Sequence, residues 1–222
     1  MNRWGLGCGG FAGLSLLAVM IGIVATAWPA ETRLWTFSEG VVGAVPRGWE
    51  ALSGRWEVRG ESPSTNRVLV QAGPSLPGLD LPAILLPSAR IENLDASVRV
   101  KATGAGTFET MGILLRWQDP GTYLSVRVDG TPGWIWVERA HEGQRSLRGG
   151  YSIDPFVPGR WHALRVVARD AWLTLFFDGR FLGGIRDDDP VPGRVGLVAG
   201  PGASVLLDDV QVIVARAFGN PG

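Results

Sequence analysis

Apolar and polar residues alternate with a period of two along much of this chain. Ala96, Val98 and Val100 fall on one side of an extended backbone, and the polar residues between them fall on the other. Residues 122–129 and 162–169 repeat this pattern. From Trp35 onward, no window of a dozen residues has apolar residues at helical spacing and also lacks Gly and Pro. The pattern therefore predicts short β-strands rather than helices.

A tight hairpin is predicted where Asp178 and Gly179 separate two aromatic runs. An Asp-Gly pair readily adopts the positive φ angles that a two-residue primed turn requires. The 32 Gly and 15 Pro residues of the chain supply further turns. Other strands are predicted at residues 34–37, 55–59, 67–71, 112–117, 134–139, 194–199 and 205–214.

A dozen or so short antiparallel strands without helices must cover their apolar faces with one another. This requirement predicts an all-β fold, a two-sheet antiparallel jelly-roll sandwich. Neither a low-complexity linker nor an internal repeat divides the chain. We therefore predict one domain over residues 31–216, followed by a frayed tail over residues 217–222.

The amino terminus has the pattern of an export signal. Arg3 precedes an uncharged, mostly apolar stretch at residues 5–27, which ends in an Ala-Thr-Ala triplet. Small side chains at these positions fit signal peptidase, so residues 1–27 are predicted to be a signal peptide cleaved after Ala27. The domain is then exported to the periplasm, the cell envelope or the medium. An uncleaved signal helix that anchors the domain to a membrane is the alternative. Cys8 would leave with the signal, and the mature chain would have no disulfide.

Charge gives little reason to expect a polyanionic partner. The chain has 21 basic and 21 acidic residues, so its formal net charge is zero at pH 7. A neutral chain has no overall field that attracts nucleic acid or an anionic membrane. We expect no nucleic-acid partner, and a membrane only if the amino-terminal segment stays uncleaved.

Five motifs follow one another in an order that is more specific than any one of them. They are WTFSEGVVGAVPRGWEALSGRWEV, VRVKATG, GILLRWQDPGTYLSVRVDG, GRWHALRVVARDAWLTLFFDGRFLG and PGRVGLVAGPGASVLLDDVQV. Their succession resembles the concanavalin A-like, laminin G-like domains of the 3-keto-disaccharide hydrolase family. The resemblance implies the jelly-roll fold and either a sugar-cleaving enzyme or a non-catalytic glycan-binding module. It also implies core positions for Trp35, Trp49, Trp56, Trp161 and Trp172.

The residues offer little material for catalysis. No Glu-x-Asp-x-x-Glu string of the laminarinase type is present, and the run from Asp187 to Asp189 is predicted to be a solvated turn before a proline. His162 lies within a predicted strand, where a buried, hydrogen-bonded structural role is expected. If the chain acts like the keto-sugar hydrolases that it resembles, a base must draw a proton near the sugar carbonyl. The candidates for that base are His141, Glu138 and Asp129.

The resemblance further implies a structural calcium ion where the first and last strands meet. Glu39 and Asp209 are the candidate ligands. Asp208 and Asp209 interrupt an apolar strand, and a buried carboxylate needs a cation or several hydrogen-bond donors. The alternative is a carboxylate that accepts hydrogen bonds from backbone amides. No other cofactor is expected.

Trp134 and Trp136 are the main candidates for ligand binding. They are two residues apart on a predicted strand, so both indoles emerge on one face, about 6.6 Å apart. Indole faces suit the C–H groups of sugars, and neighbouring polar side chains suit the hydroxyls. The alternative is that both indoles fill the core, because Ile135 and Val137 form an equally apolar face and only one set can lie inside. The predicted ligand-binding residues are Arg116, Trp117, Tyr123, Arg127, Trp134 and Trp136.

Three hypotheses for the function follow. The first is an exported, non-catalytic module that binds a glycan or oligosaccharide weakly on its concave face. The second is a glycoside hydrolase that acts on 3-keto-disaccharides or related sugars. The third is a structural domain of the cell envelope that uses its sheets for protein contacts. The orientation of the strand that carries Trp134 decides whether the first hypothesis stands.

Overall fold

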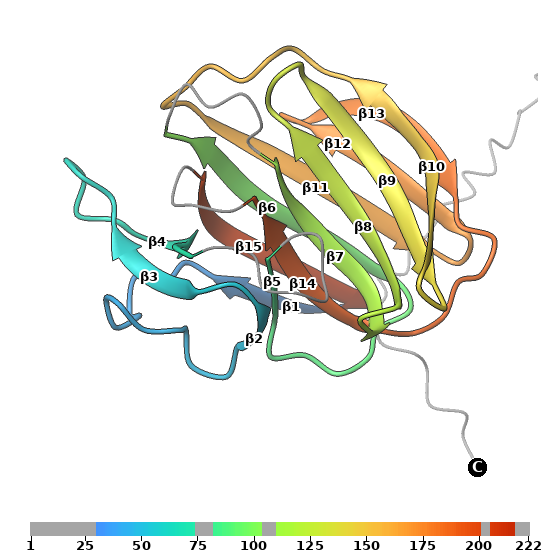
Figure 1. Ribbon diagram of the computed structural model, residues 1–222, viewed down its shortest axis with the longest axis horizontal. Coiled ribbons are helices and arrows are strands. Elements are labelled where there is room, and N and C mark those ends of the chain that lie inside the picture. The colour runs from blue at the N-terminus through green and yellow to red at the C-terminus, as the bar shows by residue number, and fades with distance from the viewer. Residues whose placement is uncertain (1–29, 74–81, 104–109, 201–204, 216–222) are drawn as a thin grey trace, which may run out of the picture.

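Two antiparallel sheets pack face to face in the computed structural model, which describes residues 30–73, 82–103, 110–200 and 205–215 (Figure 1). The predicted all-β sandwich is confirmed. The eight-stranded sheet has the order β13 (Arg180–Arg186), β12 (Trp172–Phe177), β11 (Trp161–Arg169), β6 (Leu94–Ala102), β15 (Val205–Ala215), β4 (Arg67–Gln71) and β3 (Trp56–Gly60), with β1 (Ala30–Trp35) also paired to β15. The seven-stranded sheet has the order β10 (Gln144–Ser152), β9 (Trp134–His141), β8 (Thr122–Asp129), β7 (Thr110–Asp119), β14 (Arg194–Ala199), β5 (Ala83–Leu85) and β2 (Glu50–Ser53).

The predicted signal peptide, residues 1–27, and the predicted tail, residues 217–222, lie outside the described residues. Over the part of the chain that the structure does describe, there is no helix with the length and apolar character needed to span a membrane.

The period-two alternation places one face of each strand in the core. On β6, Ala96, Val98 and Val100 are buried between the sheets, while Arg99 is exposed on the outer face. The equivalent inward rows are Leu124, Val126 and Val128 on β8 and Leu164, Val166 and Ala168 on β11. These predicted faces are confirmed, because burying a continuous apolar face is what favours the folded sandwich.

Two glycines shape the side of the sandwich where β12 and β13 form a hairpin. Asp178 and Gly179 both have positive φ angles, 49° and 77°, which confirms the predicted primed turn. Further along β13, a Cβ atom on Gly183 would stand 2.3 Å from the hydroxyl oxygen of Tyr151 on β10. That hydroxyl donates a hydrogen bond of 3.0 Å to the carbonyl of Gly184. A glycine at position 183 therefore lets the edges of the two sheets meet.

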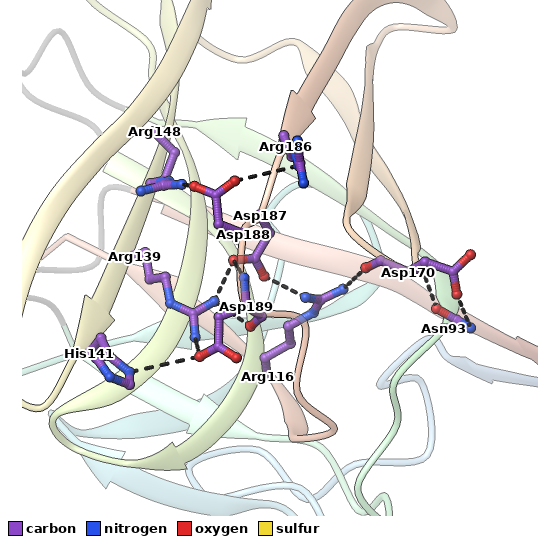
Figure 2. A network of polar contacts seen from close by, with 10 residues as sticks. All are labelled: Asn93, Arg116, Arg139, His141, Arg148, Asp170, Arg186, Asp187, Asp188 and Asp189. Atoms are coloured by element: carbon purple, nitrogen blue, oxygen red, sulfur yellow. Dashed lines mark hydrogen bonds and ion pairs between the residues drawn. The ribbon is translucent and has the colours of Figure 1, made fainter.

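A buried ion-pair network closes one end of the sandwich (Figure 2). The carboxylate of Asp187, which follows β13, is fully buried and accepts hydrogen bonds from Arg116 of β7 and Arg139 of β9. The prediction of a solvated turn is therefore wrong for Asp187, although Asp188 and Asp189 are exposed. Buried guanidinium groups require a counter-charge, and Asp187 supplies it to both.

The strand β7 is irregular where it contributes to this network. Its pairing register with β8 shifts between Leu115 and Asp119, and Arg116 has a left-handed φ of 54°. Besides Asp187, the guanidinium of Arg116 donates a hydrogen bond of 2.6 Å to the backbone carbonyl of Asp170. Burial lowers the pKa of Arg116, and the charge of Asp187 opposes that effect.

We expect Asp187→Ala to destabilise the fold by about 3–5 kcal/mol, because it leaves the buried guanidinium of Arg116 without a carboxylate and removes one of the two carboxylates that bind Arg139. Urea unfolding followed by circular dichroism measures this loss. The matched control is Asp188→Ala, which removes an exposed carboxylate and should cost less than about 1 kcal/mol. Equal stability of the two variants would contradict the structural role of Asp187.

Candidate functional site

Trp134 and Trp136 lie on the outer face of the seven-stranded sheet. Ile135 and Val137, which alternate with them on β9, are fully buried in the core. Both indoles are half-buried at the surface. The alternative in which the indoles fill the sandwich is therefore wrong, because the aliphatic pair already occupies that space.

The two indoles stack on one another. Their ring centroids are 4.9 Å apart and their planes differ by 10°. The Trp136 ring also leans over β10, where a Cβ atom on Gly150 would stand 2.8 Å from its Cε3 atom. The pair therefore offers its outer ring faces and edges to a ligand. The sequence instead predicts two indoles side by side, with a sugar lying across both.

Polar groups flank the indoles on the neighbouring strand β8. Arg127 is the cross-strand partner of Trp136, and Ser125 is the partner of Glu138. The guanidinium of Arg127 donates a hydrogen bond of 3.1 Å to Glu138. Its buried Nε atom has no hydrogen-bond partner within the described parts of the chain. Arg127 thus lies beside the indoles as part of an ion pair, with one buried donor left unpaired.

The acidic group nearest to Trp134 on β8 is Asp129, its cross-strand partner. Its carboxylate accepts a hydrogen bond of 2.6 Å from the hydroxyl of Thr110. We use the name indole surface for the outward side chains of Ser125, Arg127, Asp129, Trp134, Trp136 and Glu138.

Trp117 and Tyr123 share this outer face but lie further along it. Tyr123 pairs with Ala140, four positions from Trp136, which is about 13 Å along the strand. The rings of Trp117 and Tyr123 stack with centroids 5.8 Å apart, and both side chains are buried. Burial raises the pKa of the Tyr123 phenol, and the charge of Glu138 adds to that effect. These two residues form an apolar cluster beside the indole surface.

Of the six predicted ligand-binding residues, the structure brings together Arg127, Trp134 and Trp136. Arg116 does not belong to this group, because its guanidinium is buried and bonded to Asp187 and Asp170. The alternation of apolar and polar residues could not predict this buried role. By alternation Arg116 would face outward, but the register shift in β7 turns its side chain away from that face.

The three candidate bases lie at different places on the seven-stranded sheet. His141 is exposed at the end of β9, with Nδ1 4.0 Å from a carboxylate oxygen of Asp189. Asp129 and Glu138 belong to the indole surface, but the pairing of β8 with β9 separates them by four positions, about 13 Å along the strands. Arg127 lies between them in the register and binds Glu138.

His162 is buried in the core, as the sequence predicts. Its Nδ1 atom lies 2.8 Å from a carboxylate oxygen of Asp178. The imidazole stacks on Phe156 and Phe177, with centroid distances of 4.4 and 5.4 Å. The expected structural role is confirmed by this burial and hydrogen bonding.

The search of protein-family models finds no match, and no curated protein sequence matches either. Solved structures do match. The carbohydrate-binding module CBM66 from Bacillus subtilis superposes with a TM-score of 0.58 at 16% identity, over 74% of this chain and 94% of that chain. A protein of unknown function with a galectin-like fold from Bacillus subtilis gives 0.54 at 10% identity, over 76% and 90% of the two chains.

This chain has a galectin-like sandwich fold. A third match is domain 4 of AbnA, a GH43 extracellular arabinanase from Geobacillus stearothermophilus, in complex with arabinotriose. It gives a TM-score of 0.54 at 12% identity, over 85% of this chain and 95% of that chain. Identities this low establish the fold alone. The resemblance to the 3-keto-disaccharide hydrolase family is not confirmed.

The calcium ligands predicted from the resemblance to laminin G-like domains are Glu39 and Asp209. Asp209, at a left-handed φ of 47° in β15, accepts a hydrogen bond of 2.9 Å from Arg99. Glu39 is exposed in the segment between β1 and β2. The described ranges contain no group of three or more His, Cys, Asp or Glu side chains that could hold a metal ion. Calcium binding stays a prediction.

Asp208 is a buried acid on the outer side of the eight-stranded sheet of this sandwich. It accepts hydrogen bonds of 2.8 Å from the Asn66 amide and from the backbone N–H of Asp209. Desolvation by burial nevertheless raises its pKa above the usual 3.8. The folded state therefore holds this proton more tightly than the unfolded chain does.

We expect Asp208→Asn to stabilise the protein at pH 7. With a raised pKa in the folded state, Asp208 weakens folding as the pH rises through 3.8 and its folded-state pKa, and the amide removes that cost. The gain should shrink toward zero as the pH falls below 3.8. Melting temperatures of both proteins between pH 3 and pH 7 measure it, with the exposed Asp154→Asn as the control. A gain of equal size at every pH would contradict the raised pKa.

Proposed function

We propose that this chain is an exported, non-catalytic module that binds glycans weakly through its indole surface. The observation that carries the proposal is the outward orientation of Trp134 and Trp136 beside the Arg127–Glu138 pair. Ring faces accept the C–H side of a sugar, while guanidinium and carboxylate groups bond its hydroxyls. The indole surface combines both kinds of group within neighbouring strands.

Two of the solved structures that match the chain are described as proteins that bind carbohydrates, which supports the proposal. One of them is a carbohydrate-binding module, and another contains arabinotriose. They share with this chain the two-sheet sandwich fold. The proposal rests on the residues of the indole surface, since the fold alone hosts many functions.

Weak binding follows from the stacked arrangement of the indoles. A sugar on one ring face buries on the order of 60 Å² of apolar area, which at roughly 25 cal/mol per Å² contributes about 1.5 kcal/mol. The inner faces of the pair cover each other, so they add nothing. Hydrogen bonds to Arg127 and Glu138 bring the total to the range of millimolar to high-micromolar dissociation constants, after the cost of ordering the ligand.

We expect Trp134→Ala to reduce glycan affinity about tenfold, because it removes the ring face on which the sugar stacks. Calorimetric titration with soluble β-glucan, xylan and arabinan measures the loss. Trp134→Phe keeps a smaller ring and should retain part of the affinity. Trp161→Ala, a half-buried tryptophan on the other sheet, is the matched control and should bind like the wild type. If none of the three glycans binds the wild type, the envelope-scaffold hypothesis replaces this one.

The proposal includes export, for which the pattern of residues 1–27 is the reason. We expect amino-terminal sequencing of the protein recovered from its producing cells to give Trp28 as the first residue. An intact amino terminus on the recovered protein would instead favour a retained anchor.

Hydrolysis of 3-keto-disaccharides is not part of this proposal. Of the candidate bases, His141 lies at the opposite end of β9 from Trp134, Glu138 is bound to Arg127, and Asp129 is bound to Thr110.

A further inference from the structure

A second aromatic surface lies on the opposite sheet of the sandwich, centred on Trp172. The family resemblance implies a core position for this residue, but its side chain is 55% exposed on the outer face of β12. Its cross-strand partners are Arg169 on β11 and Arg186 on β13. Directly paired residues project from the same face of a sheet. The indole is therefore flanked on both sides by an arginine.

The Trp172 ring leans over the edge strand β13. A Cβ atom on Gly184 would stand 3.6 and 3.8 Å from the ring atoms Cε3 and Cζ3. Gly184 is paired with Thr174, so no bulky side chain covers the backbone at this place. The indole thus lies against the sheet with its other face open, in the manner of Trp136 over Gly150 on the first sheet.

Further aromatic side chains continue this surface along the same two strands. Phe176 and Phe181 are cross-strand partners, four positions from Trp172 and about 13 Å along β12. Their rings meet edge to face at 5.7 Å, and Phe181 is 62% exposed. The guanidinium of Arg165 lies 4.9 Å from the centre of the Phe176 ring. The result is an open strip, aromatic at both ends, which fits an elongated ligand.

The charges of this strip are of one sign. In β11, β12 and β13, all of which the structure describes, the outward positions carry Arg165, Arg169 and Arg186 and no acid. Asp95 of β6 binds Arg165 through two hydrogen bonds of 2.8 and 2.6 Å. Among the residues that the structure describes, the guanidinium of Arg186 contacts only the exposed carboxylate of Asp188, at 3.4 Å. The backbone of Arg169 pairs with Trp172, but its guanidinium has neither a hydrogen-bond nor an ion-pair partner within the described ranges.

We propose that this strip, the Trp172 surface, binds a linear polysaccharide that carries carboxylate groups, such as a polymer of uronic acids. One sugar ring stacks on the open face of Trp172, and its carboxylate accepts paired hydrogen bonds from Arg169 or Arg186. The aromatic pair at Phe181 contacts a later part of the same polymer. This surface is separate from the indole surface, since the two lie on the outer faces of opposite sheets.

The position of the indole favours a polysaccharide over a lipid bilayer. A membrane contact needs apolar side chains that protrude by about 5–10 Å into the headgroup and acyl boundary. Trp172 instead lies against β13, and two arginines stand beside it at the same level. This geometry presents a ring face to a ligand that lies along the sheet.

Binding of the full chain to polygalacturonate, to alginate and to fully methyl-esterified polygalacturonate tests the proposal. The esterified polymer keeps the sugar ring and removes the charge, so the wild type should bind the acid forms more tightly. Trp172→Ala should weaken binding to the acid forms about tenfold, the effect expected for one indole face. The double substitution Arg169→Gln and Arg186→Gln should abolish the preference for the acid form over the ester.

Trp134→Ala is the control that separates this surface from the indole surface, and it should keep the wild-type preference for the acid polymer over its ester, whatever binding it loses at the indole surface. Because Trp172 is exposed, Trp172→Ala should keep the melting temperature of the wild type. The proposal is wrong if the wild type binds neither acid polymer, or if Trp172→Ala binds them as the wild type does. It is also wrong if Trp172→Ala lowers binding only to vesicles of phosphatidylglycerol and phosphatidylcholine, which would make the surface a lipid contact.

Discussion

A strand in a two-layer sandwich can bury only one of its two faces, and in β9 that constraint places three different features at once. Ile135 and Val137 fill the core, so Trp134 and Trp136 must face outward. The inward row continues to Arg139, which reaches the end of the core and meets the buried carboxylate of Asp187. A shift of this strand by one residue would bury the indoles and expose the aliphatic pair. The candidate binding surface and the closing ion-pair network therefore depend on one register.

The Asp187 network joins parts of the chain that are distant in sequence. Arg116 comes from a bulged strand, Arg139 from the end of a regular one, and Asp187 from the connection after β13 (Figure 2). Without this carboxylate, Arg116 would carry an uncompensated charge in a region of low dielectric constant, and Arg139 would keep only its ion pair with Asp189. Their geometry fixes where β7 and β9 stand relative to the connection. The side chains that flank the indoles project from β8, which lies between these two strands.

The two outer faces of the sandwich have related constructions. In each, a tryptophan leans over a glycine of the adjacent edge strand: Trp136 over Gly150 on β10, and Trp172 over Gly184 on β13. A ring held in this way loses little conformational freedom when a ligand stacks on it. The faces differ in charge, since Arg127 beside Trp136 is paired with Glu138, whereas Arg169 and Arg186 flank Trp172 on three strands that carry no acid. A chain with no net charge thus carries a locally basic surface.

The sequence by itself determined the fold class, most strands and the Asp178–Gly179 turn, because period-two alternation and turn chemistry are local properties. It missed β2, β5 and β10. In β10 both faces carry polar residues or glycine, since an edge strand need not bury a regular row. For the candidate site, it identified Trp134, Trp136 and Arg127, but two equally apolar faces left their orientation open.

Only the tertiary structure decided between those faces, because burial depends on which row the opposing sheet covers. Arg116 and Asp187 are buried because of a bulge in β7 and an ion pair between distant segments. Neither feature leaves a periodic pattern of apolar and polar residues in the sequence. Trp172 lies on the surface because Leu173 and Leu175, which alternate with it on β12, fill the core. Its neighbours Arg169 and Arg186 come from other strands, and strand pairing alone brings the three together.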